Sequence, residues 1–138
     1  MEEAVRGFGE RSGYAMSLPL VHSAVTIGMF GNLRADLPNS TRTHFATWIA
    51  SHPEFRPEFQ RLLLGAFPAL RASFVFGLRH NAFVFNEWQV EKVGRRTRLP
   101  ADLSDETKEI LTASRFVGRW FSKAGSAPTI LSLLGFGA

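Results

Sequence analysis

The side chains best suited to catalysis in this 138-residue chain are its four histidines and its carboxylates. The histidines stand at His22, His44, His52 and His80, and no two of them have HExxH or HxxxH spacing. Zinc sites gather such ligands closely, often with cysteine, and the chain has no cysteine. We therefore interpret the histidines as ordinary polar residues, and we expect no metal site and no cofactor.

Three further patterns with catalytic precedent fail on their spacing. Gly7-Phe8-Gly9 lacks the preceding strand and the spacing of a dinucleotide-binding loop, and neither GxxxxGK[ST] nor GxSxG occurs. Glu87, Glu91 and Lys92 contain the groups of a nuclease site, but their alternation suits the solvent face of a hairpin. We assign no catalytic residue and expect that the protein is not an enzyme.

Charge and aromatic content both favour a binding protein. The formal charge is +4, and the excess lies in residues 34–98, which carry ten basic and five acidic side chains. Such a surface favours DNA or an acidic protein patch, a merely solvated surface being the equal alternative. Thirteen Phe and three Trp exceed what a small core readily holds, so we expect some at an interface, the alternative being that all are internal.

The absence of cysteine also suits a reducing compartment. The first residues lack the pattern of a signal peptide, and no apolar run approaches the roughly 20 residues of a membrane-spanning helix. We expect a cytoplasmic protein with no membrane contact.

Apolar spacing predicts a mainly α protein with one β-hairpin. The expected elements before residue 94 are helices at 17–35, around Phe45, Trp48 and Ile49, at 58–64 and from Phe67 to about His80, then strands at 82–86 and 88–93. Gly65 and Pro68 separate the third helix from the fourth, and Asn86-Glu87 forms the hairpin turn.

A long helix is predicted over residues 104–124, headed by Ser104 and stopped by Gly125. The tail, residues 126–138, is apolar and uncharged, so we expect it to be docked rather than loose. It either folds back against Phe116 and Trp120 or lies on a partner.

Together these elements predict a single domain over residues 1–138. Three helices followed by a hairpin is the order of a winged helix-turn-helix, so residues 17–93 are interpreted as a winged-helix-like core. In that interpretation the helix from Phe67 is the recognition helix, and residues 82–93 are the wing.

Two sets of binding residues follow from this arrangement. The candidates for contact with the nucleic-acid backbone are Lys92, Arg95, Arg96, Arg98, Arg71 and Arg79. The alternative for the arginines after the wing is a solvated linker. The apolar candidates for a partner interface are Phe76, Trp88, Phe121, Ile130, Leu133, Leu134 and Phe136.

Three stretches of the chain carry a family likeness. They are Met16 to Leu20 with Leu37-Pro38, Ser40 to Thr43 and Trp48; Phe76-Gly77-Leu78; and Ser114 to Phe121 with Ala124 to Ser126, Pro128 to Ile130 and Leu134-Gly135. In these stretches, which span nearly the whole chain in order, it resembles the middle-component proteins of three-component ABC-ATPase systems. These are bacterial conflict systems that include Lamassu-type anti-phage defence.

The resemblance implies a non-catalytic adaptor subunit between an SMC-like ABC ATPase, which senses foreign or broken DNA, and an effector subunit, often a nuclease. DNA would be contacted through the assembled complex. The sequence departs from the family pattern in two places, because the helix before Gly7-Phe8 begins late and Leu133-Leu134 replaces a usual aromatic.

The alternative function is a free-standing winged-helix DNA-binding transcriptional regulator. Such a regulator needs several hydrogen-bond donors on its recognition helix. In the helix from Phe67 only Arg71 and Arg79 are strong hydrogen-bond donors. That face is better suited to binding protein.

Overall fold

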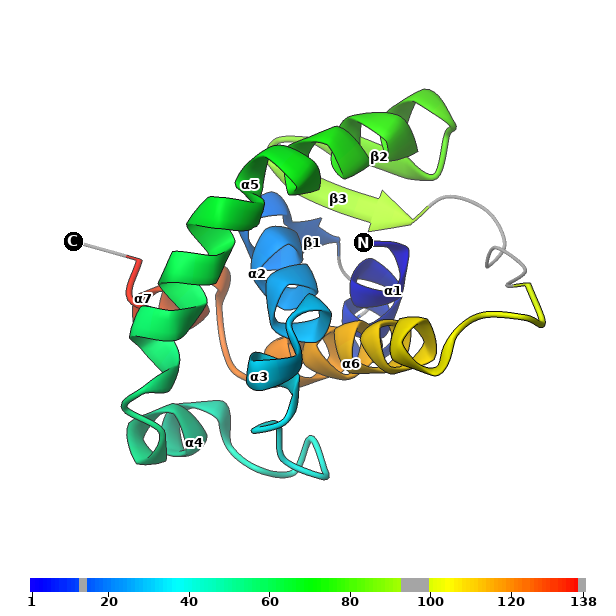
Figure 1. The fold of residues 1–138 in the computed structure, drawn as a ribbon. Helices are drawn as coiled ribbons and strands as arrows, with labels where there is room; N and C mark the ends of the chain where they lie inside the picture. Colours follow the sequence, from blue (N-terminus) through cyan, green and yellow to red (C-terminus); the bar gives the residue numbers. More distant parts are fainter. Residues whose placement is uncertain (13–14, 93–99, 137–138) are drawn as a thin grey trace.

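The computed structural model describes residues 1–12, 15–92 and 100–136, and in this part of the chain the fold is mainly helical (Figure 1). Seven helices and three short strands occur in the order α1 (Glu2–Ser12), β1 (Met16–Ser17), α2 (Leu18–Met29), α3 (Gly31–Arg34), α4 (Phe45–Ser51), α5 (Phe55–Arg79), β2 (Phe83–Asn86), β3 (Gln89–Lys92), α6 (Asp105–Ser122) and α7 (Ala127–Leu133). The prediction of a mainly α protein is confirmed.

Helix α2 lies at the centre, with α5 on one side and α6 on the other (Figure 1). Eight of its twelve residues are buried, which requires an almost wholly apolar sequence. Its two buried hydroxyls satisfy themselves within the helix: Ser23 Oγ donates to Pro19 O at 2.8 Å, and Thr26 Oγ1 donates to His22 O at 2.8 Å. The helix therefore crosses the core without leaving these polar groups unpaired.

Glycines bring three helices into backbone contact. A Cβ atom on Gly118 of α6 would collide with Ala4 O of α1, and one on Gly7 of α1 would collide with Arg115 O of α6. A Cβ atom on Gly28 of α2 would collide with the Oγ and N atoms of Ser114 of α6. Only glycine permits this spacing, because any side chain at these positions would meet main-chain atoms that cannot move away.

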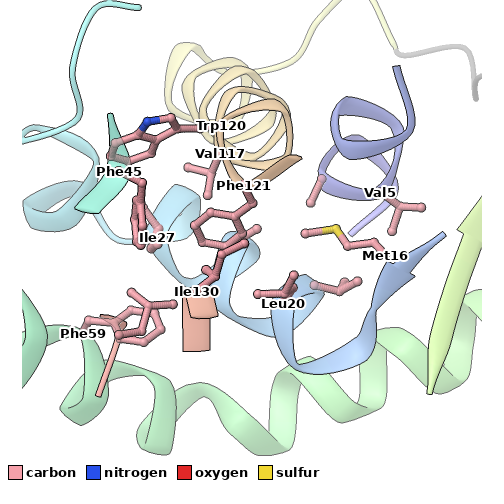
Figure 2. Close-up of a cluster of buried hydrophobic side chains, with 14 of the residues drawn as sticks. Val5, Met16, Leu20, Ile27, Phe45, Phe59, Val117, Trp120, Phe121 and Ile130 are labelled. Carbon is pink, nitrogen blue, oxygen red and sulfur yellow. The ribbon is translucent and has the colours of Figure 1, made fainter. Parts of the chain in front are cut away.

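The core draws side chains from α1, β1, α2, α4, α5, α6 and α7 (Figure 2). At one end it is an aromatic cluster, in which the Trp120 ring lies 4.9 Å from Phe45 and 5.2 Å from Trp48. Trp120 Nε1 donates to Thr43 O at 2.7 Å, so the indole nitrogen is paired although it is buried. This bond and the ring contacts fix α4 and the loop before it against α6.

The predicted break between residues 58–64 and the helix from Phe67 is wrong, because α5 is one helix of 25 residues. Its buried stripe passes through the region of Gly65 and Pro68 without interruption, from Phe59 through Ala66 and Leu70. Pro68 removes one helical hydrogen bond, to Leu64 O, at an exposed place where water can replace it. The helix from Phe67 is therefore the second half of α5 and not a separate recognition helix, and the winged-helix arrangement stays a prediction.

By length and composition α5 is also apolar enough to cross a bilayer, the one helix of the described residues that passes this test. A core helix passes the same test when it is mostly buried, whereas 22% of the tested window of α5 is buried, including Leu70 and Phe74.

The predicted hairpin is confirmed, with two corrections. Its turn is formed by Glu87 and Trp88, one residue later than predicted, since these two residues have φ angles of 51° and 65°. A third strand, β1, was not predicted and pairs antiparallel with β3, giving the order β1-β3-β2. A two-residue strand has too little alternation to be recognised in a sequence.

The long helix predicted over residues 104–124 is confirmed as α6, with Ser104 Oγ accepting from Thr107 N at 3.1 Å. The tail contains α7, whose Ile130 is buried in the core together with Leu134. Its neighbours include α2 and the first half of α5, where Arg56 Nε donates to Leu133 O at 2.7 Å. The sequence pointed instead to Phe116 and Trp120.

We expect Gly118→Ala to lower the free energy of unfolding by at least about 2 kcal/mol, because the added methyl group meets the backbone of α1. The matched control is Gly65→Ala in the exposed middle of α5, where no atom lies within 4 Å of the new Cβ. It should raise stability by about 0.5–1 kcal/mol. Urea unfolding of both variants checks the pair, and equal effects would contradict the close approach of α1 and α6.

Candidate partner-binding site

The large apolar side chains that the described residues leave exposed all belong to α5 or to the hairpin. They are Leu64, Phe67, Val75, Phe76, Val84, Phe85 and Trp88. Leu64, Trp88 and Phe76 are the most open, at 77%, 69% and 65% exposure. Apolar side chains gathered on two adjacent elements are typical of an interaction surface, whereas single exposed ones carry no such meaning.

Helix α5 presents these residues on both sides of its buried stripe. Successive residues of an α-helix are about 100° apart, so Leu64, Phe67 and Val75 fall on one side and Phe76 on the other. The Phe76 ring packs only on its own helix end, 4.1 Å from the ring of His80. The surface therefore has two parts, one beside Phe67 and one around Phe76.

The part beside Phe67 contains a groove of about 410 Å³. Four segments form its walls: the start of α2, the middle of α5, the hairpin turn, and α7 with the residues after it. The lining residues are Leu18, Pro19, His22, Ser23, Leu63, Phe67, Trp88, Leu131 and Phe136. Apart from His22 and Ser23 these side chains are all apolar, so the groove favours an apolar occupant.

His22 is the one titratable group in this wall. Its residue is only 8% exposed, and its ring lies edge-on to Phe67 at 5.5 Å and to Phe74 at 6.5 Å. The Nε2 atom is buried without a hydrogen-bond partner. Burial lowers the pKa of His22 below its ordinary value of 6.5, because the charged imidazolium loses its hydration there. The groove therefore contains a neutral imidazole with an unused hydrogen-bonding atom.

Trp88 is held at the rim of the groove by the hairpin turn. Its φ of 65° lies in the left-handed region, which costs an ordinary residue roughly 1–2 kcal/mol. The backbone is fixed there by Leu18 N, which donates to Trp88 O at 2.8 Å. Turns of this kind favour asparagine or glycine, so a tryptophan at this position is a local departure from the best folding sequence.

The predicted partner-interface residues separate into two groups. Phe76 and Trp88 are exposed, and Leu133 and Phe136 are half-buried. Phe121, Ile130 and Leu134 are completely buried, so we correct their assignment from interface to core. Their helices α6 and α7 turn these side chains toward α2, and a single sequence does not distinguish an apolar face that packs internally from one that packs on a partner.

The predicted nucleic-acid contacts are described only in part. Arg71 and Arg79 are exposed on α5. Lys92 is the last residue of β3, and its side chain lies outside what the structure describes, as do Arg95, Arg96 and Arg98 entirely.

Sequence reasoning missed the groove because its wall comes from four separate segments. The available signal was His22 itself, a lone imidazole in the otherwise apolar run LPLVHSAVTIGM of α2. Interpreting it as an ordinary polar residue overlooked that its flanking residues must be buried, which forces the ring into an apolar setting.

A second hollow, of about 580 Å³ between α3 and α6, has a structural use. Arg34 Nη1 there donates to Gly28 O at 3.0 Å and to Met29 O at 3.1 Å, and Nη2 lies 3.6 Å from Glu109 Oε2. The guanidinium thus closes the carboxyl end of α2. Within the described ranges, no three His, Asp or Glu residues lie close enough to hold a metal ion.

Comparison with known families identifies the family of the chain. A family model described as the ABC-three component (ABC-3C) system Middle Component 3 matches residues 1–137. The chain belongs to this family. No curated protein and no solved structure matches it. The resemblance drawn from the stretches between Met16 and Gly135 is confirmed at the level of the family, and this Middle Component 3 protein is the middle component of an ABC-three component system.

We expect stability to depend on pH through His22. Because its folded pKa lies below the unfolded value of 6.5, its contribution is present above pH 6.5 and is lost as the pH falls through the folded pKa. His22→Leu should remove this contribution, so the loss of stability between pH 7.5 and pH 5 becomes smaller than in the wild type. Urea unfolding at both pH values measures the difference, and an equal loss in the two proteins would contradict the burial of a neutral imidazole.

Proposed function

We propose that this protein is the non-catalytic adaptor of its ABC-three component system and links the ABC ATPase to the effector component. The observation that carries the proposal is the gathering of exposed apolar side chains on α5 and the hairpin of a middle component. A subunit that joins two others needs surfaces with apolar centres, and α5 offers one on each side of its buried stripe.

The chemistry of the chain supports a binding role. It has no cysteine, and its histidines belong to four separate places, namely α2, the start and the end of α4, and the end of α5. In the detailed form of the proposal the ATPase is SMC-like and senses foreign or broken DNA, as in Lamassu-type anti-phage defence. The adaptor then transmits the state of the ATPase to an effector such as a nuclease. A free-standing regulator is the weaker candidate, because family membership makes the chain part of a multi-component system.

Co-expression with the ABC ATPase and effector components should yield a stable complex by size-exclusion chromatography. Phe76→Glu should reduce the amount of complex at least tenfold, because it places a charge on an apolar surface that is 65% exposed in the free chain. Since Phe76 does not enter the core, the variant should melt within a few degrees of the wild type.

Thr47→Glu is the matched control, an exposed position on α4 that gains the same charge. It should assemble like the wild type. If the wild-type chain elutes alone beside both co-expressed components, the adaptor role is wrong.

The proposal includes DNA contact through the assembled complex, made by the basic residues that follow the hairpin. Replacing Arg95, Arg96 and Arg98 together by Ala should weaken DNA binding by the complex. The slope of log affinity against log salt concentration should become shallower by roughly two to three units, as fewer counterions are released. Fluorescence anisotropy over a salt series measures that slope. An unchanged slope would mean that these three arginines form only a solvated linker and do not contact DNA.

A further inference from the structure

We propose that the groove between α2, α5, α7 and the hairpin turn binds an amphipathic helix of the ABC ATPase component. One apolar side chain of that helix enters beside His22, and acidic residues at its two ends face Arg56 and Arg71. This inference rests on the proposed adaptor function and deepens it, since it names the surface, the partner element and its chemistry.

The shape of the groove requires a helical occupant. Its walls are side chains of three helices and one turn, and almost all of the lining is apolar. A segment buried there finds no backbone partners in the walls, so it must satisfy its own amide and carbonyl groups. An α-helix does this, and the exposed ridge of Leu64, Phe67 and Val75 offers it a surface of helix-packing spacing.

The charges along α5 set the polarity and the length of that helix. Arg56 and Arg71 are exposed on α5 and flank in sequence the groove-lining residues Leu63 and Phe67, and Arg56 also donates from Nε to Leu133 O at 2.7 Å. Neither makes an ion pair with another described residue. Fifteen residues separate them, which is about 22 Å along a helix axis, or roughly four helical turns. Acidic residues near the two ends of a four-turn helix complement this spacing.

His22 supplies the specific contact. His22 lines the groove, and its Nε2 atom is buried and has no partner in the chain, so an occupant reaches this atom only when the ring turns toward the groove. An unpaired buried polar atom is costly, so an occupant that presents one hydrogen-bonding side chain within an apolar face satisfies it. The occupant's apolar face therefore contains one polar side chain opposite His22.

The conformation and exposure of Trp88 favour a role in binding over a role in folding. The turn that presents it would be relieved by glycine, yet the chain keeps a tryptophan there with 69% of its surface exposed. Large rings held open at the rim of an apolar groove are the usual anchors of protein interfaces. Among the three tryptophans only Trp88 is open to solvent, since Trp48 and Trp120 are 5% and 1% exposed. Quenching of its fluorescence by acrylamide therefore reports occupancy of the groove.

The decisive variant is Trp88→Gly in the full-length chain, tested against the purified ABC ATPase component. It should raise the dissociation constant at least tenfold while the melting temperature stays the same or rises. If Trp88 were merely structural, the variant would bind more weakly and would also melt at a lower temperature. His22→Leu should weaken binding about tenfold, and Arg71→Glu about fivefold at low salt and less at high salt. Thr47→Glu, carrying the same charge far from the groove, should bind like the wild type. Addition of the ATPase component should protect Trp88 from acrylamide.

Four outcomes overturn the proposal, and they separate it from the adaptor function. If Trp88→Gly and Arg71→Glu bind the ATPase as the wild type does while Phe76→Glu does not, the groove is not the site and the adaptor function stands. If the groove variants lose only the effector component, the partner is wrong. If the chain alone forms a dimer that Trp88→Gly converts to a monomer, the occupant is a second copy. If the wild type binds neither component, both proposals fail.

Discussion

The fold depends on the backbone contact of α1, α2 and α6, which glycine alone permits. Gly7 and Gly118 let α1 and α6 touch main chain to main chain, and Gly28 lets α2 approach Ser114 of α6. With α2 and α6 this close, the rings of Trp120 and Phe121 reach Phe45 at the far end of the core. The other elements take their positions from this pair: α4 packs on the aromatic cluster, and α5 and α7 cover the open side of α2.

The same contact explains why the binding surface lies where it does. Helix α2 is buried by α6 on one side and by α5 on the other, but α5 is longer than α2 and extends past it to the hairpin. Along its length α5 covers the core with only one stripe, which leaves Leu64, Phe67, Val75 and Phe76 in solvent. The exposed side chains are thus those that flank the buried stripe of this 25-residue helix.

Local chemistry in the sequence predicts some of these elements well. Ser104 and Ser126 both cap helices through their own hydroxyl groups, and the alternation around Phe83 and Val90 yields the hairpin. Pro68 misled the prediction, because its cost depends on whether solvent can reach the carbonyl that it leaves unpaired, and the sequence alone does not supply that. Strand β1 was missed because its partner β3 lies about 75 residues away. Helix α1 was expected only from the family resemblance, because it is stabilised by α6, about 110 residues away. No local sequence pattern indicates the groove, because its lining comes from four separate segments.

The pairing of α1 with α6 also sets the order in which the protein can be completed during synthesis. Gly7 meets Arg115 and Ala4 meets Gly118, so α1 finds its partner only after more than 100 further residues have been synthesised. At roughly 5–20 residues per second, α1 waits several seconds with its apolar face uncovered. Helix α2 also waits for α6 to bury one of its sides. The nascent chain therefore has no finished core until α6 has emerged.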